Sequence, residues 1–315
     1  MATPPDSITL SVIVAVHDIS DKLEWLNTRL CNVLKSYNKT FELIYVDDGS
    51  QDTSWQVLQS LCHQHPFIRI IKLRTAFGES SVLEAALEIA KGENILFYTA
   101  GIGVNPSDLI QVINELDTDV DVVIGARSPR RDSYINRFVS RLFNFFTNRL
   151  TSLRLKDINS GVLATRRQVL EHVPFYGALN TFIPVMAHNQ GYKITEINVE
   201  QLTGNYKRAL HPRDYVRRLL DLVSVIFLSR YTKKPLHFLG FLGVLFTGIG
   251  AAIDIYLFFY RLLGFGGIAG RPILLLGMVL LVIGLQMIAI GLLGEMIIFT
   301  HARDIQEYNI EEIID

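Results

Sequence analysis

Short apolar runs alternate with amphipathic stretches over most of the chain. Apolar runs rich in β-branched residues predict strands, and apolar residues spaced three or four positions apart predict helices. Strands are expected at Ile8–Val16, Phe41–Val46, Ile68–Leu73, Asn94–Tyr98, Val120–Gly125 and Lys193–Val199. Helices are expected at Asp21–Tyr37, Thr53–Gln64, Glu79–Lys91, Pro106–Leu116, Tyr134–Leu150 and Tyr215–Phe227. This alternation is typical of an α/β fold with a mostly parallel sheet that is covered on both faces.

Two long apolar runs, Pro235–Leu263 and Ile273–Thr300, follow this pattern near the C-terminus. Each is long enough to cross a bilayer as a helix, which takes about 20 apolar residues. The chain is 49% hydrophobic with a mean hydropathy of +0.27, and these two runs account for the excess over a wholly soluble domain. The pattern predicts a cytosolic domain at 1–210, a basic amphipathic juxtamembrane segment at 211–234, two transmembrane helices within 235–300 and a tail at 301–315.

The distribution of charge indicates the orientation and excludes one class of partner. A formal net charge of −1 gives no overall attraction to nucleic acid. Basic residues are concentrated before the first apolar run, whereas the link between the runs has only Arg261 and Arg271 at its edges. The positive-inside rule then places the domain and the C-terminus in the cytoplasm, so we expect a multi-pass protein of the inner (plasma) membrane. The only cysteines, Cys31 and Cys62, fit reduced thiols in that compartment.

Chemically marked segments follow three of the predicted strands. They are His17-Asp18, Asp47-Asp48-Gly49-Ser50 and Thr99-Ala100-Gly101. Ligands bind beyond the carboxyl ends of the strands in an open α/β sheet. Carboxylates there can accept hydrogen bonds from a base or a ribose, or hold a divalent cation that faces phosphates. A turn that uses Asp and Gly for backbone reasons is the alternative for 47–50.

Three longer segments form an ordered set with these. Tyr45–Thr53 reads Y-V-D-D-G-S-Q-D-T, Leu73–Gly78 reads L-R-T-A-F-G, and Arg154–Gly161 reads R-L-K-D-I-N-S-G. They resemble the V-D-D-G-S-x-D-x-T, L-x-R-N-x-G and D-x-x-S-G segments of glycosyltransferase family 2 enzymes with a GT-A fold. With the two apolar runs, nearly the whole chain is similar to the membrane-anchored polyprenyl-phosphate glycosyltransferases, of the dolichol-phosphate mannosyltransferase and bactoprenol glucosyltransferase kinds.

This resemblance implies a fold and an activity. The fold is a GT-A-type, Rossmann-like, mostly parallel sheet followed by two transmembrane helices. The activity is inverting transfer of a sugar from a UDP- or GDP-linked donor to an undecaprenyl-type phosphate. It would take place at the cytoplasmic membrane face, for modification of cell-envelope glycan or glycolipid. Membrane lipids are then partners, and glycines that recur in both apolar runs leave a homo-oligomer open.

The resemblance also implies roles for individual residues. Asp18 and Asp48 would contact the nucleoside with Asp47 nearby, and Asp157 would be the catalytic carboxylate, as base, metal ligand or acceptor-positioning group. A turn or helix-capping role is the alternative for Asp157. The other candidates are Thr99 and Gly101 at the nucleotide and, for the phosphates or the acceptor, Arg127, Lys207, Arg208, Arg213, Arg217 and Arg218.

One departure from the family pattern concerns the metal. The family carries Asp-x-Asp where this chain has Thr99-Ala100-Gly101, so both carboxylates are missing. Use of Mg²⁺ or Mn²⁺ is therefore left open. Two alternatives to the leading function stay open as well: a catalytically silent membrane scaffold that binds a nucleotide, and a metal-independent transferase with another lipid acceptor. The missing carboxylates favour the scaffold, and the retained Asp47, Asp48 and Asp157 oppose it.

Overall fold

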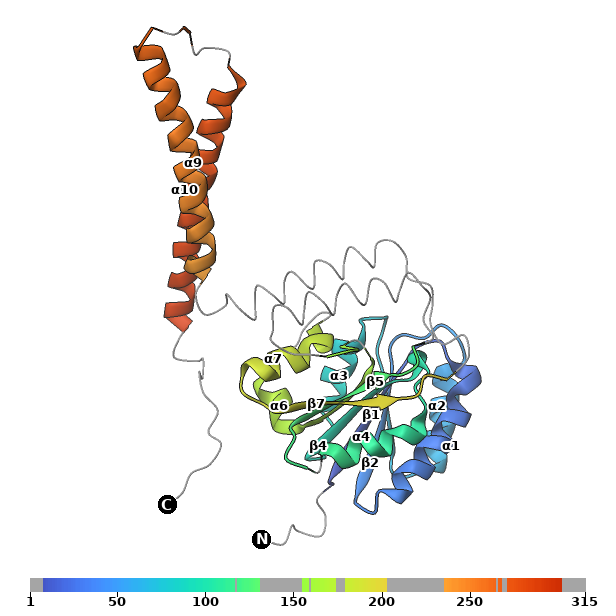
Figure 1. The fold of residues 1–315 in the computed structure, drawn as a ribbon. Coiled ribbons are helices and arrows are strands. Elements are labelled where there is room, and N and C mark those ends of the chain that lie inside the picture. Colours follow the sequence, from blue (N-terminus) through green and yellow to red (C-terminus); the bar gives the residue numbers. More distant parts are fainter. Residues whose placement is uncertain are drawn as a thin grey trace, which may run out of the picture. The chain divides into compact units, whose positions relative to one another are not determined.

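The computed structural model describes residues 8–116, 118–130, 155–158, 160–173, 179–202, 235–264, 266–267 and 271–301. The chain divides into two units, Met1–Val225 and Ile226–Asp315, and each is described by itself (Figure 1). The helices predicted at 134–150 and 215–227 lie outside the described residues.

A seven-stranded sheet forms the centre of the first unit, with the strand order β3-β2-β1-β4-β6-β5-β7. Only β6 runs antiparallel to its neighbours, β4 and β5, and the other pairings are parallel. The strands are β1 (Leu10–Val16), β2 (Phe41–Asp47), β3 (Ile68–Lys72), β4 (Asn94–Thr99), β5 (Val122–Arg127), β6 (Val162–Arg166) and β7 (Ile194–Val199). The predicted α/β class with a mostly parallel sheet is confirmed, although the sequence analysis missed β6.

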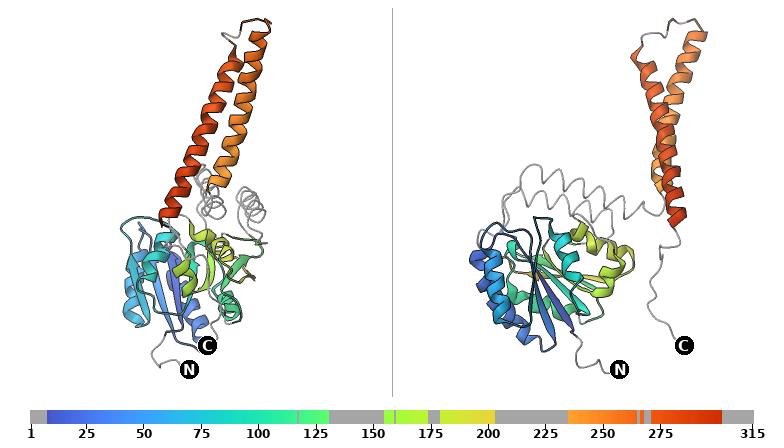
Figure 2. Two further views of the ribbon diagram at one scale, coloured as in Figure 1. Left: turned by 90° about the vertical axis from the view of Figure 1, so that its left-hand side faces the viewer. Right: turned by 180° about the vertical axis from the view of Figure 1, so that it is seen from behind.

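Helices cover both faces of this sheet (Figures 1 and 2). They are α1 (Ser20–Ser36), α2 (Ser54–Gln64), α3 (Glu79–Leu87), α4 (Leu109–Leu116), α6 (Arg167–His172) and α7 (Ile183–Asn189), with short 3-10 turns η1 (Ala100–Ile102), η2 (Pro106–Asp108) and η3 (Leu179–Phe182). Helices α1, α2 and α4 pack beside one another on one face, whereas α3 contacts β1, β2 and η3 on the other.

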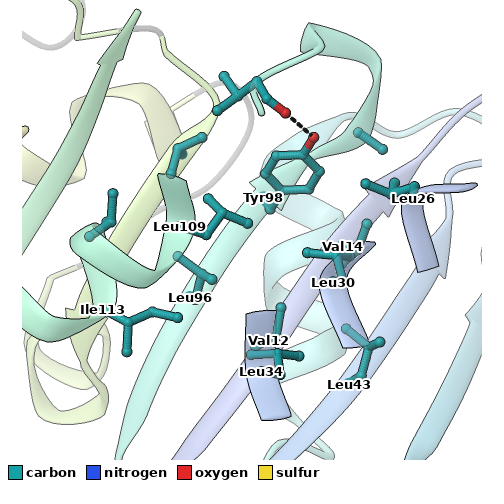
Figure 3. Close-up of a cluster of buried hydrophobic side chains, with 14 of the residues drawn as sticks. Val12, Val14, Leu26, Leu30, Leu34, Leu43, Leu96, Tyr98, Leu109 and Ile113 are labelled. Carbon is teal, nitrogen blue, oxygen red and sulfur yellow. Dashed lines mark hydrogen bonds between the residues drawn. The ribbon is translucent and has the colours of Figure 1, made fainter. Parts of the chain in front are cut away.

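The main core lies between the sheet and the helices α1 and α4, which pack on one of its faces. Val12 and Val14 of β1 point toward Leu30 and Leu34 of α1, and all four are buried (Figure 3). Ile13, which lies between them in the strand, faces the opposite side and is buried too. Burial on both faces explains why the strands are continuous apolar runs rather than alternating ones.

The second unit is a pair of long apolar helices, α9 (Pro235–Leu262) and α10 (Pro272–His301). Each is long and apolar enough to cross a membrane, with mean hydropathies of 2.0 and 2.8 over their candidate spans. Glycines let the helices approach closely: a Cβ at Gly243 would lie 2.7 Å from the Gly284 carbonyl oxygen, and one at Gly250 would lie 2.6 Å from that of Gly277. Most of the large apolar side chains on both helices are exposed, as expected for a surface that faces lipid.

Candidate active site

The site lies where β1 is flanked by β2 on one side and β4 on the other. This is the point at which the strand order reverses, and ligands of doubly wound sheets bind beyond the carboxyl ends of the strands there. Val16 of β1 pairs in register with Asp47, and Ala15 pairs with Thr99. The three chemically marked segments therefore leave the sheet side by side, as the sequence analysis expects.

Asp18 organises the loop that follows β2. Its Oδ1 accepts hydrogen bonds from the backbone N–H groups of Gln51 (2.7 Å) and Asp52 (3.4 Å), and its own N–H donates to Ser50 Oγ (3.0 Å). Asp18 has a φ of 48°, in the left-handed region, where Asp is tolerated better than most residues. Its side chain is 32% exposed, so it can meet a ligand while it holds the loop.

Asp48 connects this loop to the segment that leads into α3. Its Oδ1 accepts from the N–H of Phe77 (2.7 Å) and its Oδ2 accepts from the N–H of Gly78 (3.0 Å). Asp47 is fully buried, and its Oδ1 accepts from the N–H of Ser50 (3.0 Å), which closes the turn. Asp47 and Asp48 thus shape the rim of the site, whatever ligand contact they make.

Gly49 allows these two loops to approach each other. It has a φ of 65°, and a Cβ at this position would lie 2.5 Å from the carbonyl carbon of Thr75. Glycine meets both requirements of this contact, because it adopts the left-handed conformation readily and has no Cβ.

Asp52 is a structural residue of the loop that the sequence analysis did not single out. Its Oδ2 accepts from the N–H of Ser20 (3.0 Å) and its Oδ1 from the N–H of Ser54 (2.9 Å), so one carboxylate serves the first turns of both α1 and α2. Burial alone would raise the pKa of Asp52, but the hydrogen bonds from Ser54 and Ser20 outweigh it and lower the pKa to about 2. An Asp two residues before a helix is the sequence signal that was available.

Thr99 and Gly101 stand at the end of β4, and a glutamate from another element reaches this point. Thr99 Oγ1 donates a hydrogen bond to Glu79 Oε1 (3.0 Å), and Asn180 Nδ2 donates to Glu79 Oε2 (3.0 Å). Gly101 contributes only backbone, within η1. The sequence analysis missed Glu79 and Asn180, because neither belongs to a motif that it used.

A small cavity of about 30 Å³ opens beside this cluster. Its lining includes Glu79, Ser160, Gly161 and Asn180, from three separate parts of the chain. The backbone N–H of Thr99 donates to the carbonyl oxygen of Gly161 (2.8 Å), which joins the end of β4 to the segment that contains Asp157. A cavity of this size has room for a water molecule or two, so it marks a gap in packing rather than a complete substrate site.

Asp157 and Arg127, which the sequence analysis proposed for separate roles, form a buried ion pair. Arg127 Nε lies 2.6 Å from Asp157 Oδ2, and Nη2 lies 3.0 Å from Oδ1. The side chain of Asp157 is 3% exposed and that of Arg127 is 0% exposed. Arg130, with its side chain 17% exposed, also approaches Asp157, with Nη1 3.4 Å from Oδ1. The backbone N–H of Asp157 donates to Glu196 Oε1 (2.9 Å), which ties the segment to β7.

The remaining basic candidates cannot be placed in this site. Lys207, Arg208, Arg213, Arg217 and Arg218 lie outside the described residues. Their roles stay predictions, as do the ligand contacts predicted for the residues described above.

The carboxylates at these strand ends take part in separate contacts and do not converge on one point. Among the described residues, no three His, Cys, Asp or Glu side chains are grouped so that they could hold a metal ion. Asp48 and Asp157 have both oxygens engaged by N–H donors. Glu79 accepts from a hydroxyl and an amide. Mg²⁺ in nucleotide sites is commonly held by one or two carboxylates, substrate phosphates and water, so a cation at these strand ends would take most of its ligands from a bound diphosphate and water.

Comparison with known proteins extends these observations. Residues 11–173, just over half of the chain, match the model of a family described as glycosyl transferase family 2. Dodecaprenyl-phosphate galacturonate synthase of Rhizobium johnstonii is 28% identical, over 99% of this chain and 95% of its own length. Undecaprenyl-phosphate 4-deoxy-4-formamido-L-arabinose transferase of Pseudomonas fluorescens is 29% identical, over 97% of this chain and 90% of its own length.

The solved structures that resemble this chain show the same fold. One is glucosyl-3-phosphoglycerate synthase from Mycobacterium tuberculosis in complex with Mn²⁺, uridine diphosphate and phosphoglyceric acid. It aligns with a TM-score of 0.52 at 18% identity and covers 71% of this chain and 78% of its own. At this identity the likeness concerns the fold alone.

Proposed function

Because the chain belongs to glycosyl transferase family 2, we propose that it transfers a sugar from a nucleotide-diphosphate sugar to a polyprenyl phosphate. One observation carries this proposal. Both relatives are named for a polyprenyl-phosphate acceptor, and they match the chain over almost its full length, apolar helices included. A soluble acceptor would not explain why two helices of membrane-spanning length follow the glycosyl transferase domain in the chain.

The donor would bind at the carboxyl ends of β1, β2 and β4. Asp18 and Asp48 lie on the rim of this site and would receive the nucleoside, either uridine or guanosine. The Mycobacterium tuberculosis structure was solved with uridine diphosphate and Mn²⁺, which supports a nucleoside diphosphate and a divalent cation, Mg²⁺ or Mn²⁺, as ligands of this fold.

The reaction would be a direct displacement with inversion. A phosphate oxygen of the lipid forms a bond to the anomeric carbon, while the bond from that carbon to the donor diphosphate breaks and the nucleoside diphosphate leaves with the electron pair. A lipid phosphate is already anionic near neutral pH, so the protein has mainly to position the reactants and stabilise the leaving charge. A cation held with the diphosphate would supply part of that stabilisation.

The ion pair of Asp157 and Arg127 would position groups at the acceptor end. Both side chains are buried and each fixes the other, so the pair forms a rigid support a few residues before Ser160 and Gly161 in the chain. Arg130 is more exposed than Arg127 and contacts the same carboxylate, which makes it the cation of this group that a phosphate can reach. Asp157 as the base or a metal ligand is the alternative role.

The membrane arrangement follows from the same proposal. We place the catalytic domain and the C-terminus on the cytoplasmic side of the inner membrane, with α9 and α10 crossing it. The basic residues of 211–234 would then lie at the anionic surface, where each cation contributes about 1 kcal/mol of attraction. The exposed apolar faces of α9 and α10 leave room for a homo-oligomer as well as for lipid.

The full chain in nanodiscs with undecaprenyl phosphate and a panel of radiolabelled UDP- and GDP-sugars tests this function. Label in the lipid phase with one donor is the expected result, in Mg²⁺ or Mn²⁺ and not in EDTA. Label that persists in EDTA would favour the metal-independent transferase, for which the carboxylate-free Thr99-Ala100-Gly101 is the supporting observation. Nucleotide binding without any labelled lipid, across dodecaprenyl and undecaprenyl acceptors, would favour the scaffold.

A further inference from the structure

Glu79 holds an unusual position among the carboxylates of the site. It is the first residue of α3, and the preceding Gly78 donates its N–H to Asp48 Oδ2 (3.0 Å). On its other side, Glu79 bonds to Thr99, the last residue of β4. Glu79 thus lies between the rim residue Asp48 and the end of β4, at the point where the strand order reverses.

Neutral hydrogen-bond donors fix the carboxylate in one orientation. Thr99 Oγ1 donates to one oxygen and Asn180 Nδ2 to the other, each at 3.0 Å. Asn180 is itself held by Ser80, because its N–H donates to Ser80 Oγ and its Oδ1 accepts from that hydroxyl, both at 3.1 Å. Such outer partners orient the ligands of metal sites.

The charge of this carboxylate is not compensated by a side chain in the described part of the chain. Glu79 takes part in none of the ion pairs found there, in contrast to Asp157 with Arg127 and Glu42 with Arg69. Glu79 is half-buried, as are Thr99 and Asn180, so the cluster is open to a ligand. Each carboxylate oxygen has about two lone-pair sites and uses one of them here, which leaves one on each oxygen for a further partner.

An uncompensated anion at this position would repel the diphosphate of the donor. A divalent cation between the two removes the repulsion, and Mg²⁺ needs only one or two protein carboxylates when phosphates and water complete its coordination. From these contacts we infer that Glu79 is the carboxylate that holds a divalent cation against the donor diphosphate, in place of the acidic side chains that Thr99-Ala100-Gly101 lacks. This inference rests on the proposed function, since it assumes a nucleotide-diphosphate donor.

Binding measurements on the full chain in nanodiscs test the inference without turnover. Isothermal titration with UDP and with GDP, in Mn²⁺ and in EDTA, gives the gain in affinity due to the metal, and the electron paramagnetic resonance of Mn²⁺ reports the bound ion directly. Mn²⁺ should bind only when the nucleotide is present. In the unmodified protein Mn²⁺ should raise the nucleotide affinity at least about tenfold, and Glu79→Gln should abolish this gain, because even outer partners of metal sites contribute about 10–100-fold.

Two comparisons separate a metal role from a structural one. Glu79→Gln should keep the nucleotide affinity that the unmodified protein shows in EDTA, which demonstrates that the variant is folded and its nucleoside site intact. Glu84→Gln, at an exposed position of the same helix, should behave as the unmodified protein does in every titration. An equal gain from Mn²⁺ in Glu79→Gln and in the unmodified protein would overturn the inference.

Other outcomes distinguish this inference from the proposed function. If Glu79→Gln keeps the Mn²⁺ effect but loses affinity for the nucleotide sugar relative to the nucleotide, Glu79 binds sugar hydroxyls and the metal assignment is wrong. If the unmodified protein binds nucleotide and labels lipid with no effect of Mn²⁺ or EDTA, the metal assignment fails while the function stands. If the unmodified protein binds neither nucleotide in either buffer, the proposed function fails.

Discussion

The buried pair of Asp157 and Arg127 gives a prediction whose magnitude follows from its geometry. Two hydrogen bonds of 2.6 and 3.0 Å join the groups, and neither side chain is more than 3% exposed. Asp157→Asn keeps the shape of the side chain but removes its charge and places an amide against a guanidinium. Removing one partner of a buried ion pair costs about 3–5 kcal/mol of unfolding free energy. We expect a loss in this range.

Urea unfolding of the full chain in detergent, followed by tryptophan fluorescence, measures this loss. The chain has two tryptophans, Trp25 and Trp55, and both belong to the first unit, so the signal reports that unit without contribution from α9 and α10. The matched control is Asp119→Asn, which breaks the ion pair of Asp119 with Lys193. The side chain of Asp119 is 89% exposed and that of Lys193 is 53% exposed. Because exposed ion pairs contribute little to stability, the unfolding midpoint should not change measurably.

The double variant shows whether the loss of stability comes from the interaction between Asp157 and Arg127 or from each residue separately. Removing both charges with Asp157→Asn and Arg127→Met should cost less than the sum of the single changes, by about 2 kcal/mol or more, because each single change already removes the direct contact between Arg127 and Asp157. Additive effects, or a loss below about 1 kcal/mol for Asp157→Asn, would show that the pair does not form as described. Nucleotide affinity should be compared only in urea-free buffer, where the variant is folded.

Three further changes test the loops around the site. Asp48→Ala should weaken nucleotide binding at least about tenfold, or about 1.4 kcal/mol, in a calorimetric titration; unchanged affinity would remove Asp48 from the nucleoside site. Gly49→Ala should lower the unfolding free energy by about 1–3 kcal/mol, because the Cβ would lie 2.5 Å from the Thr75 backbone at a φ of 65°; an unchanged value would show that the turn relaxes freely. Asp52 has its pKa lowered to about 2 from 3.8, so its ionised form stabilises the folded state above about pH 4, and this is lost as the pH falls toward 2. Asp52→Asn should flatten the pH dependence of unfolding in that window, and equal slopes in both proteins would contradict the assignment.

The strand and helix pattern was predictable because the sheet is buried on both faces. Continuous β-branched runs such as Ile8–Val16 have no other stable place in a domain of this kind. The limits appear at β6, a run of only five residues that pairs antiparallel between β4 and β5. No local pattern indicates such an insertion, because the pairing partners are about 40 or more residues away along the chain.

The end of β5 shows how a distant contact moves an element boundary. The sequence analysis ends this strand at Gly125, two residues before Arg127, and an arginine is rarely fully buried without a partner. The structure extends β5 to Arg127, since Asp157 compensates the guanidinium from a segment 30 residues later. The same contact turns two residues that were predicted for different roles into one ion pair.

A site residue could be predicted where its type and its position at a strand end are enough to identify it. It could not be predicted where it reaches the site only through a contact between two elements. Acidic residues directly after β1 and β2 could be expected to meet, because parallel strands end at the same edge. Glu79 is separated from Thr99 by 20 residues and reaches it only because α3 begins beside the end of β4. A carboxylate that is missing from the linear motif is therefore present in space. The segment Thr99-Ala100-Gly101 lacks two carboxylates, whereas the structure brings one acidic side chain, that of Glu79, to the same strand end.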